Sequence, residues 1–181
     1  MRLRANRETD PQVLDALNES QSRVMAMAQV HEALYRSESL AEIDLLVYLR
    51  TLADTLPQLY PLAGRGVRIS LDAAPDIRLG IDQAVPCGLV INELLSNAIK
   101  HAFPEGRGGE AVIKAGRRED GALEIDLRDN GVGLPPGFDW RASRSMGLSL
   151  VRGLVEDQLR GAIETFETKG TWFRIVVPPA A

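Results

Sequence analysis

A polar stripe on an otherwise apolar helical segment is the part of this sequence best suited to chemistry. The segment runs from Asn92 to Phe103, and at about 3.6 residues per turn four of its polar side chains fall within about one third of the circumference: Glu93, Asn97, Lys100 and His101. An amide oxygen is a suitable Mg2+ ligand, an amine or imidazole can contact phosphate, and a carboxylate can accept a proton. The stripe therefore predicts a site for a hard cation and a polyphosphate. The alternative is a solvated face with ordinary i,i+4 neighbours.

Three glycine-containing segments follow further along the chain. They are Asp129-Asn130-Gly131-Val132-Gly133-Leu134, Met146-Gly147-Leu148 and Gly170-Thr171-Trp172-Phe173. Each alone is a weak signal, because Asn-Gly after an alternating strand is most often a turn. Together with the helical segment, and in this order, they resemble the N, G1, G2 and G3 boxes of the histidine-kinase ATP-binding domain, within the group shared with gyrase, Hsp90 and MutL. The resemblance runs from about Ile69 to Pro178 and implies binding of ATP with Mg2+.

The resemblance assigns Asp129 to the adenine base. In the family this aspartate accepts a hydrogen bond from the adenine amino group, and a carboxylate would repel the O6 acceptor of guanine. A hydrogen bond to a charged group contributes about 1.5–3 kcal/mol, which favours ATP over GTP by about tenfold or more. Gly131 and Gly133 would allow positive φ and close approach of the backbone to the nucleotide. Thr171 would support the same end of the nucleotide, or be a plain strand residue.

The phosphate end is assigned in the same way to Ser145, Met146, Gly147 and Leu148, which open a helix whose free amides can hold phosphate. The family commonly has Gly-Leu-Gly-Leu here, and Ser145 replaces the first glycine. Asn97 would bind Mg2+, while Lys100 and His101 would contact phosphates. The resemblance makes Glu93 the base that deprotonates the accepting imidazole; alternatively it orients a water on Mg2+. The short stretch between Gly133 and Gly147 would be the lid over the nucleotide, anchored by Phe138 and Trp140.

An N-terminal helix is predicted from Asp10-Pro11 to about Ser37, and its segment Ser22–Tyr35 resembles the later part of the dimerisation region in HisKA_2-type sensor kinases. Its long apolar stripe requires a partner, either a preceding helix or another subunit: Val13, Leu14, Leu17, Val24, Met27, Ala28, His31 and Leu34. His31 precedes an acid, as a phosphoacceptor would, or packs within a helical hairpin. The HisKA_2 pattern places the phosphorylated histidine in the first helix, upstream of Met1.

Periodicity predicts the remaining elements. Helices are expected over Ile43–Tyr60, after a capping box formed by Ser39 and Glu42, over the central segment capped by Asp82, and over Met146–Leu159. Strands are expected at Val67–Leu71, Ile77–Leu79, Ala111–Arg117, Ala122–Arg128, Ala162–Glu167 and Thr171–Val177. This order predicts an α+β fold: a helical hairpin remnant over residues 1–40, then a two-layer α/β sandwich over 41–181 with a mixed, mostly antiparallel sheet and helices on one face, as in GHKL (Bergerat) ATP-binding domains.

Composition narrows the function. The net charge of −4 does not suggest nucleic acid or a membrane surface as a partner. The single cysteine excludes an internal disulfide. No apolar run is long enough to span a membrane, so we expect a cytoplasmic chain. The sequence as a whole predicts the ATP-binding catalytic portion of a two-component sensor histidine kinase. It would transfer the ATP γ-phosphate to a histidine, then to a response-regulator receiver domain, and form a homodimer through its N-terminal helices. The alternatives are an anti-sigma-type serine kinase and a non-catalytic phosphotransfer or dimerisation module.

Overall fold

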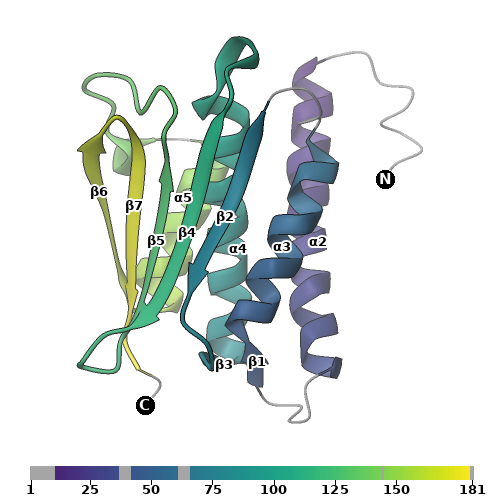
Figure 1. Cartoon of the computed structure of the whole chain (residues 1–181), viewed down its shortest axis with the longest axis vertical. Helices are drawn as coiled ribbons and strands as arrows, with labels where there is room; N and C mark the ends of the chain where they lie inside the picture. Colours follow the sequence, from purple (N-terminus) through teal and green to yellow (C-terminus); the bar gives the residue numbers. More distant parts are fainter. Residues whose placement is uncertain (1–10, 37–41, 61–65, 144, 180–181) are drawn as a thin grey trace.

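A five-stranded sheet forms one layer of the molecule. The computed structural model describes residues 11–36, 42–60, 66–143 and 145–179. The strand order is β2-β4-β5-β7-β6 (Figure 1), with β2 at Val67–Ala73, β4 at Gly109–Arg117, β5 at Leu123–Asp129, β6 at Ala162–Thr168 and β7 at Gly170–Val177. The β2–β4 pair is parallel and the other three pairs are antiparallel. The predicted mixed, mostly antiparallel sheet is confirmed.

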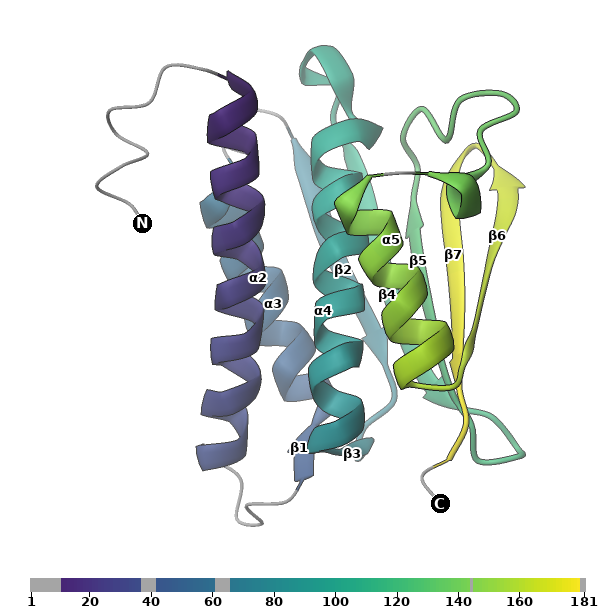
Figure 2. The same ribbon diagram turned by 180° about the vertical axis from the view of Figure 1, so that it is seen from behind.

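Helices form the second layer, on one face of the sheet (Figure 2). The long elements are α2 at Pro11–Arg36, α3 at Leu45–Leu59, α4 at Ile81–Asn97 and α5 at Met146–Gly153. Single-turn π-helices continue α4 and α5, namely η1 at Ala98–Ala102 and η4 at Leu154–Gln158, and short 3-10 turns lie at Pro104–Gly106 (η2) and Trp140–Ala142 (η3). α4 and α5 cover the sheet, whereas α2 lies further out and packs against α4 and α3.

The hydrophobic core lies between α4 and the sheet. Ile91 and Leu95 of α4 are fully buried, as are Ile113 of β4 and Ile125 of β5. Neighbouring side chains of β4 and β5 point to opposite faces, so Ile113 and Ile125 face the helices while Lys114 and Glu124 point to the outer face. Burial of each such side chain contributes about 1.5–3 kcal/mol, which fixes α4 over the centre of the sheet.

A second, two-stranded sheet joins the starts of α3 and α4. It pairs β1 (Glu42–Asp44) with β3 (Arg78–Gly80) in antiparallel orientation, and β1 is a strand that periodicity did not predict. Asp44 caps α3 by accepting a hydrogen bond from the Val47 amide at 3.2 Å, whereas the predicted capping residue Ser39 lies outside the described residues.

The predicted cap of α4 was wrong. The N-cap is Gly80, which makes no side-chain hydrogen bond, and Asp82 lies inside the first turn. The physical reason is the pairing of β3, which continues through Gly80, so that the helix begins at the next residue. Asp82 still places a negative charge near the positive end of the helix dipole.

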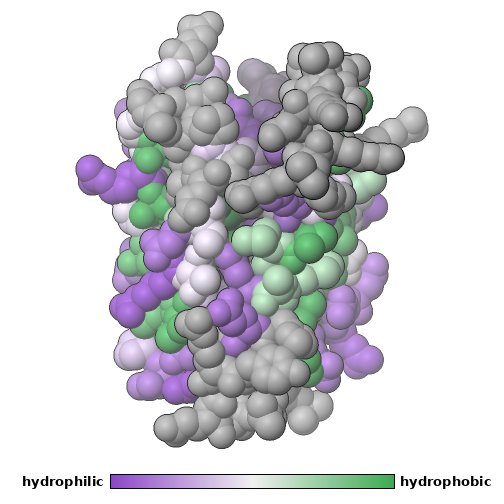
Figure 3. Space-filling view, turned by 90° about the vertical axis from the view of Figure 1, so that its right-hand side faces the viewer, coloured by the Kyte–Doolittle hydropathy of each residue, from purple (hydrophilic) through white to green (hydrophobic). Residues whose placement is uncertain are grey.

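The buried face of α2 carries polar side chains, whereas its exposed face carries apolar ones. Ser22, Ala26 and Gln29 are buried against the rest of the molecule, and the Gln29 amide nitrogen donates to the Thr55 hydroxyl at 2.6 Å. Members of the predicted apolar stripe face outward, where Val24 is 58% and Met27 is 49% exposed. Figure 3 shows hydrophobic residues between hydrophilic ones on the side of the molecule that carries α2 and α3. His31 lies in α2, but its side chain is outside the described residues.

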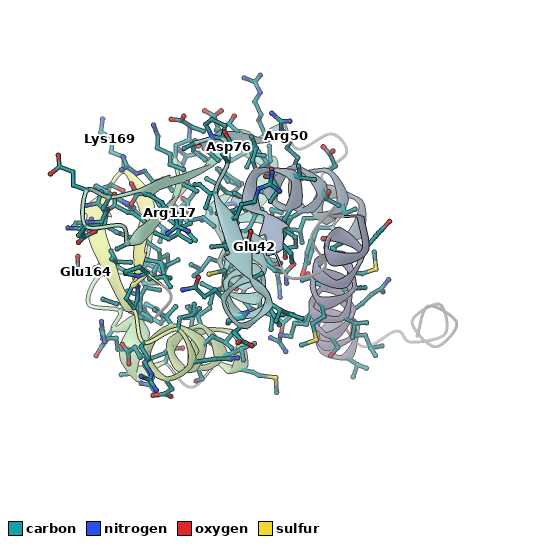
Figure 4. All side chains as sticks on the ribbon, turned by 90° about the horizontal axis from the view of Figure 1, so that it is seen from below. Glu42, Arg50, Asp76, Arg117, Glu164 and Lys169 are labelled. Carbon is teal, nitrogen blue, oxygen red and sulfur yellow. The ribbon has the colours of Figure 1, made fainter. Side chains whose placement is uncertain are left out.

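The outer face of the sheet is polar. Asp126 of β5 is buried there and accepts hydrogen bonds from Trp172 Nε1 at 2.8 Å, Arg174 Nε at 2.9 Å and Arg128 at 2.8 Å. Burial works to raise the pKa of Asp126, but the hydrogen bonds from Arg174, Trp172 and Arg128 together lower it below its ordinary value. Seen from below, Glu164 and Lys169 lie at the edge of the sheet far from α2 (Figure 4). Among the described residues, no helix has the length and apolar character needed to cross a membrane.

Candidate functional site

A cavity of about 520 Å3 opens between α4 with η1, the loop after β5 and the beginning of α5. Its volume falls in the range of about 300–1,000 Å3 typical of small-molecule sites. It brings together all of the predicted site residues except Gly131: Glu93, Asn97, Lys100, His101, Asp129, Gly133, Ser145, Met146, Gly147, Leu148 and Thr171. Residues from the helical stripe and from all three glycine segments therefore line one space.

Asp129 lines the cavity. It is the last residue of β5, and its Oδ1 accepts hydrogen bonds from the Gly131 amide at 2.9 Å and the Thr171 amide at 3.2 Å. These two amides fix the orientation of the buried carboxylate. Its other oxygen, Oδ2, makes no hydrogen bond to any residue that the structure describes. The carboxylate thus presents one acceptor oxygen for a ligand.

Glycines allow close approach of the backbone around Asp129. A Cβ at Gly170 would lie 2.0 Å from the Asp129 carbonyl oxygen, so no side chain fits there. Gly133 has the predicted positive φ, at 77°. Gly131 does not have a positive φ, so that prediction was wrong; a Cβ there would lie 2.3 Å from the Ala102 carbonyl oxygen. Gly131 therefore serves the packing of the loop against η1.

The start of α5 also lines the cavity. Ser145 is the N-cap, and its hydroxyl accepts a hydrogen bond from the Leu148 amide at 3.4 Å. The amide of Ser145 itself donates to the Ser143 hydroxyl at 3.2 Å. Helix geometry leaves the first amides of a helix without partners inside it, so those of Met146 and Gly147 are placed to bind an anion. The serine that replaces the expected glycine has a structural role as the cap.

The helical stripe reaches the cavity in spite of a change in helix type. Glu93 and Asn97 belong to α4, whereas Lys100 and His101 belong to the π-helical turn η1. The expected segment is therefore not α-helical throughout. A π turn inserts a residue into the helix, and such turns are frequent at functional sites. All four side chains still line the cavity, with His101 exposed and Lys100 partly buried.

Glu93 already has a partner, which sequence reasoning missed. Arg23 of α2 donates from Nε to Glu93 Oε1 at 2.6 Å and from Nη2 to Oε2 at 3.0 Å. Lys100 is similarly paired, at 2.6 Å, with Glu19 of α2. The hydrogen bond to Glu93 raises the pKa of Arg23, against an opposing effect of burial, so the guanidinium stays charged. The i,i+4 spacing of Glu19 and Arg23 could have placed both side chains on one face of α2, but it does not identify their partners on α4.

The segment between Gly133 and Gly147 covers one side of the cavity. Trp140 in η3 is buried and packs edge-on against Phe173, with ring centroids 5.6 Å apart, as expected of an anchor. Phe138 lines the cavity but is exposed, so it does not anchor the segment. Exposed Val132 and Met146 lie near it, and apolar side chains grouped beside a cavity are typical of binding sites.

Comparisons with known proteins agree with this geometry. Residues 1–60 match the HisKA_2 family, described as histidine kinase, and residues 82–181 match the HATPase_c family, described as histidine kinase-, DNA gyrase B-, and HSP90-like ATPase. The chain is 37% identical over 166 residues to the sensor histidine kinase PdtaS of Mycobacterium tuberculosis, covering 90% of this chain and 32% of PdtaS. The chain thus spans about a third of the length of this relative.

Two further similarities bear on the fold and on the alternatives. The histidine kinase domain of Erythrobacter litoralis EL346 blue-light activated histidine kinase superposes with a TM-score of 0.78 at 23% identity, covering 88% of this chain and 74% of that one. The anti-sigma F factor of Heyndrickxia coagulans is 26% identical over 105 residues, which is 52% of this chain and 69% of that factor. The HisKA_2 match over residues 1–60 favours the sensor kinases over the anti-sigma factors. The second match covers more than half of the chain, so the chain belongs to the histidine kinase-, DNA gyrase B- and HSP90-like ATPase family. The first match identifies it as a histidine kinase of the HisKA_2 type.

Proposed function

We propose that this chain is the ATP-binding catalytic portion of a two-component sensor histidine kinase. The observation that carries the proposal is the set of polar groups that line the cavity. They combine the Oδ2 oxygen of Asp129, whose Oδ1 is held by two backbone amides, with Asn97, Lys100 and the start of α5. A nucleotide offers matching groups, a hydrogen-bond donor on its base and negative charge on its phosphates.

The adenine amino group is proposed to donate to Asp129 Oδ2. The backbone amides of Gly131 and Thr171 already hold Oδ1, so the base meets a fixed acceptor. Gly133 and Gly170 let the loop after β5 and the start of β7 pack closely around Asp129. Thr171 contributes its amide to this arrangement, and we propose that its side chain lines the adenine end.

Mg2+ is proposed to bind between Asn97 and the phosphates. Among the described residues, no group of three or more His, Cys, Asp or Glu is placed to hold a metal. An amide oxygen with phosphate oxygens and waters suits Mg2+, which is usually bound through few protein ligands. Lys100, His101 and the amides of Met146 and Gly147 would then bind the remaining phosphate charge.

Phosphoryl transfer needs positioning and charge stabilisation more than covalent chemistry by the protein. A histidine nitrogen would form a bond to the γ-phosphorus while the bond to the β-phosphate oxygen breaks and ADP leaves. We propose that Glu93 accepts the imidazole N–H proton. From the phosphohistidine, the phosphoryl group would pass to an aspartate of a response-regulator receiver domain.

Nucleotide binding and labelling test this proposal together. Calorimetry should show ATP binding that weakens when Mg2+ is removed with EDTA, and absence of binding would refute the proposal. Incubation with γ-labelled ATP, followed by acid and alkali treatment, tests for a phosphohistidine. An acid-labile, alkali-stable label that is lost in His31→Gln would make His31 the acceptor. ATP binding without label would place the acceptor outside residues 1–181.

A homodimer is proposed to form through the exposed stripe of α2. Val24 and Met27 are about half exposed on a long helix, and apolar side chains repeated on one face favour helix–helix association. Introducing Val24→Glu with Met27→Glu should convert a dimer into a monomer in light scattering coupled to size exclusion. Glu42→Gln on β1 is a control far from the stripe in the sequence. A parent chain that is monomeric at high concentration would refute this interface.

A further inference from the structure

Two ion pairs join α2 to the cavity. Arg23 pairs with Glu93, and Glu19 pairs with Lys100 at 2.6 Å. Glu19 and Arg23 are themselves 3.5 Å apart, one turn from each other on α2. The four side chains therefore form a row of alternating charge, Lys100–Glu19–Arg23–Glu93, which we call the α2 ion-pair cluster. α2 lies beside α4 (Figure 2).

Three of the four side chains in the α2 ion-pair cluster are largely buried. The side chains of Glu93, Lys100 and Arg23 are only 7%, 11% and 14% exposed, while that of Glu19 is 35% exposed. The guanidinium of Arg23 occupies both oxygens of Glu93, a two-point contact that fixes the carboxylate. The less buried Glu19–Lys100 pair is the one that incoming charge can exchange most easily.

The cluster opposes the chemistry proposed for the cavity. Both oxygens of Glu93 accept hydrogen bonds from Arg23, so Arg23 competes with any other proton donor for this carboxylate. Lys100 is neutralised by a carboxylate in the place where it would meet a phosphate. Glu19 itself lines the cavity, so its negative charge repels the phosphates of a nucleotide.

The contact between α2 and α4 is also incompletely satisfied. Ser22 donates to Asn92 at 2.9 Å, but Asn92 Nδ2 is buried without a hydrogen-bond partner among the described residues. The hydroxyls of Ser96 and Tyr60 are likewise buried and unpartnered within the described residues, and both line the cavity beside α2. A buried polar group without a partner is unfavourable, so access of water to Asn92 and Ser96 favours separation of α2 from α4.

We propose that Glu19 and Arg23 are positioning residues that couple α2 to the nucleotide site. With α2 docked, Lys100 and Glu93 are held by protein charges; phosphates compete with Glu19 for Lys100, and loss of that pair loosens α2 and frees Glu93 from Arg23. Nucleotide binding and docking of α2 therefore oppose each other, and each weakens the other by the same factor. The inference rests on the proposed function, because it takes Lys100 to be a phosphate contact.

Glu19→Gln tests the competition directly. The variant removes the charge that neutralises Lys100 and repels phosphates, so ATP should bind roughly 2- to 5-fold more tightly, as expected for loss of one partly exposed charge. Adenosine carries no phosphate, and its affinity should stay unchanged. The matched control is Glu32→Gln, an exposed acid about 3.6 turns further along α2, which should bind ATP like the parent. Equal ATP affinity in Glu19→Gln and the parent would overturn the proposal.

Amide hydrogen exchange in α2 tests whether nucleotide binding weakens the docking of this helix. Saturating Mg-ATP should speed exchange of the amides over residues 17–29, whereas adenosine should not. Arg23→Gln should speed the same exchange without nucleotide, and Arg23→Lys, which keeps the charge but not the two-point contact, should lie between it and the parent. Slower exchange of α2 with ATP would overturn the proposal, because it would mean that α2 completes the site. If the parent and every variant bind neither ATP nor adenosine, the proposed function fails and the coupling with it; ATP binding without any effect on α2 refutes the coupling alone.

Discussion

Replacing Asp129 with asparagine separates the charge of this side chain from its structural role. Asparagine has the same shape, and its Oδ1 can still accept hydrogen bonds from the amides of Gly131 and Thr171 that hold the loop. An NH2 group then takes the place of Oδ2 in the cavity and faces the adenine amino group, donor against donor. The lost hydrogen bond to a charged acceptor contributes about 1.5–3 kcal/mol, so ATP affinity should fall about 10- to 100-fold.

The affinity for GTP should respond to Asp129→Asn in the opposite direction to the affinity for ATP. Its O6 is an acceptor that the carboxylate repels and that the new NH2 group can bind. Titration of parent and Asp129→Asn with ATP and GTP at fixed Mg2+ should therefore show that the preference for ATP shrinks or reverses. Affinity for the phosphates is common to both nucleotides and cancels in the ratio.

Asp126→Asn is the matched control. Asp126 lies on the same strand but on the outer face of the sheet, and it is also buried and hydrogen-bonded. Its exchange should lower the unfolding temperature, because Arg174 and Arg128 lose a charged partner, yet leave ATP affinity unchanged. The reasoning is refuted if Asp129→Asn unfolds like the parent and binds ATP equally well, or if Asp126→Asn weakens ATP binding as much.

Three further perturbations address the metal, the glycine contact and the core. Asn97→Ala should abolish the Mg2+ dependence of ATP binding in calorimetry with and without EDTA. Gly170→Ala should destabilise the fold by about 1–3 kcal/mol in urea unfolding and weaken ATP binding, because its Cβ would overlap the Asp129 backbone; Gly116→Ala on β4, where a Cβ meets nothing within 4 Å, should have neither effect. Burial raises the pKa of the Cys87 thiol from 9.0 to about 12. Burial of the neutral thiol therefore stabilises the fold fully below pH 9.0, and this stabilisation is lost as pH rises toward 12, because the unfolded chain then releases the proton more readily. At pH 10 the loss should be on the order of 1 kcal/mol, and Cys87→Ala should remove this part of the alkaline decline.

Local patterns predicted most of the fold, and the resemblance of four motifs to the histidine-kinase ATP-binding domain grouped the residues that line the cavity. Alternation identified the strands of the sheet, because each has one buried and one solvated face. The end of β5 at Asp129 and the start of α5 at Met146 follow from short signals, a glycine turn and an abrupt return of helical spacing. The cavity lies where these two ends meet the stripe of α4, so its residues came from motifs that are contiguous in the sequence.

Contacts between distant segments could not be predicted in the same way. Arg23 and Glu93 are 70 positions apart, and no local pattern pairs one arginine with one buried glutamate. The strand β1 is three residues long and owes its conformation to its pairing with β3, not to its own composition. The π turn η1 changes the helix type without interrupting the apolar spacing from which the helix was predicted.

The arrangement of α2 reverses the usual orientation of an amphipathic helix. Its buried face carries Ser22, Gln29 and the ion-pairing Arg23, and its exposed face carries Val24 and Met27. Ion pairs and hydrogen bonds contribute little net free energy, since both partners are solvated when the helix is released. Burial of an apolar face contributes about 25 cal/mol per Å2, so the proposed pairing of the exposed stripe with another helix would add a hydrophobic contribution that the polar contacts lack. Its attachment to the nucleotide site is then the weaker and reversible contact, which is the condition that coupling between α2 and ATP requires.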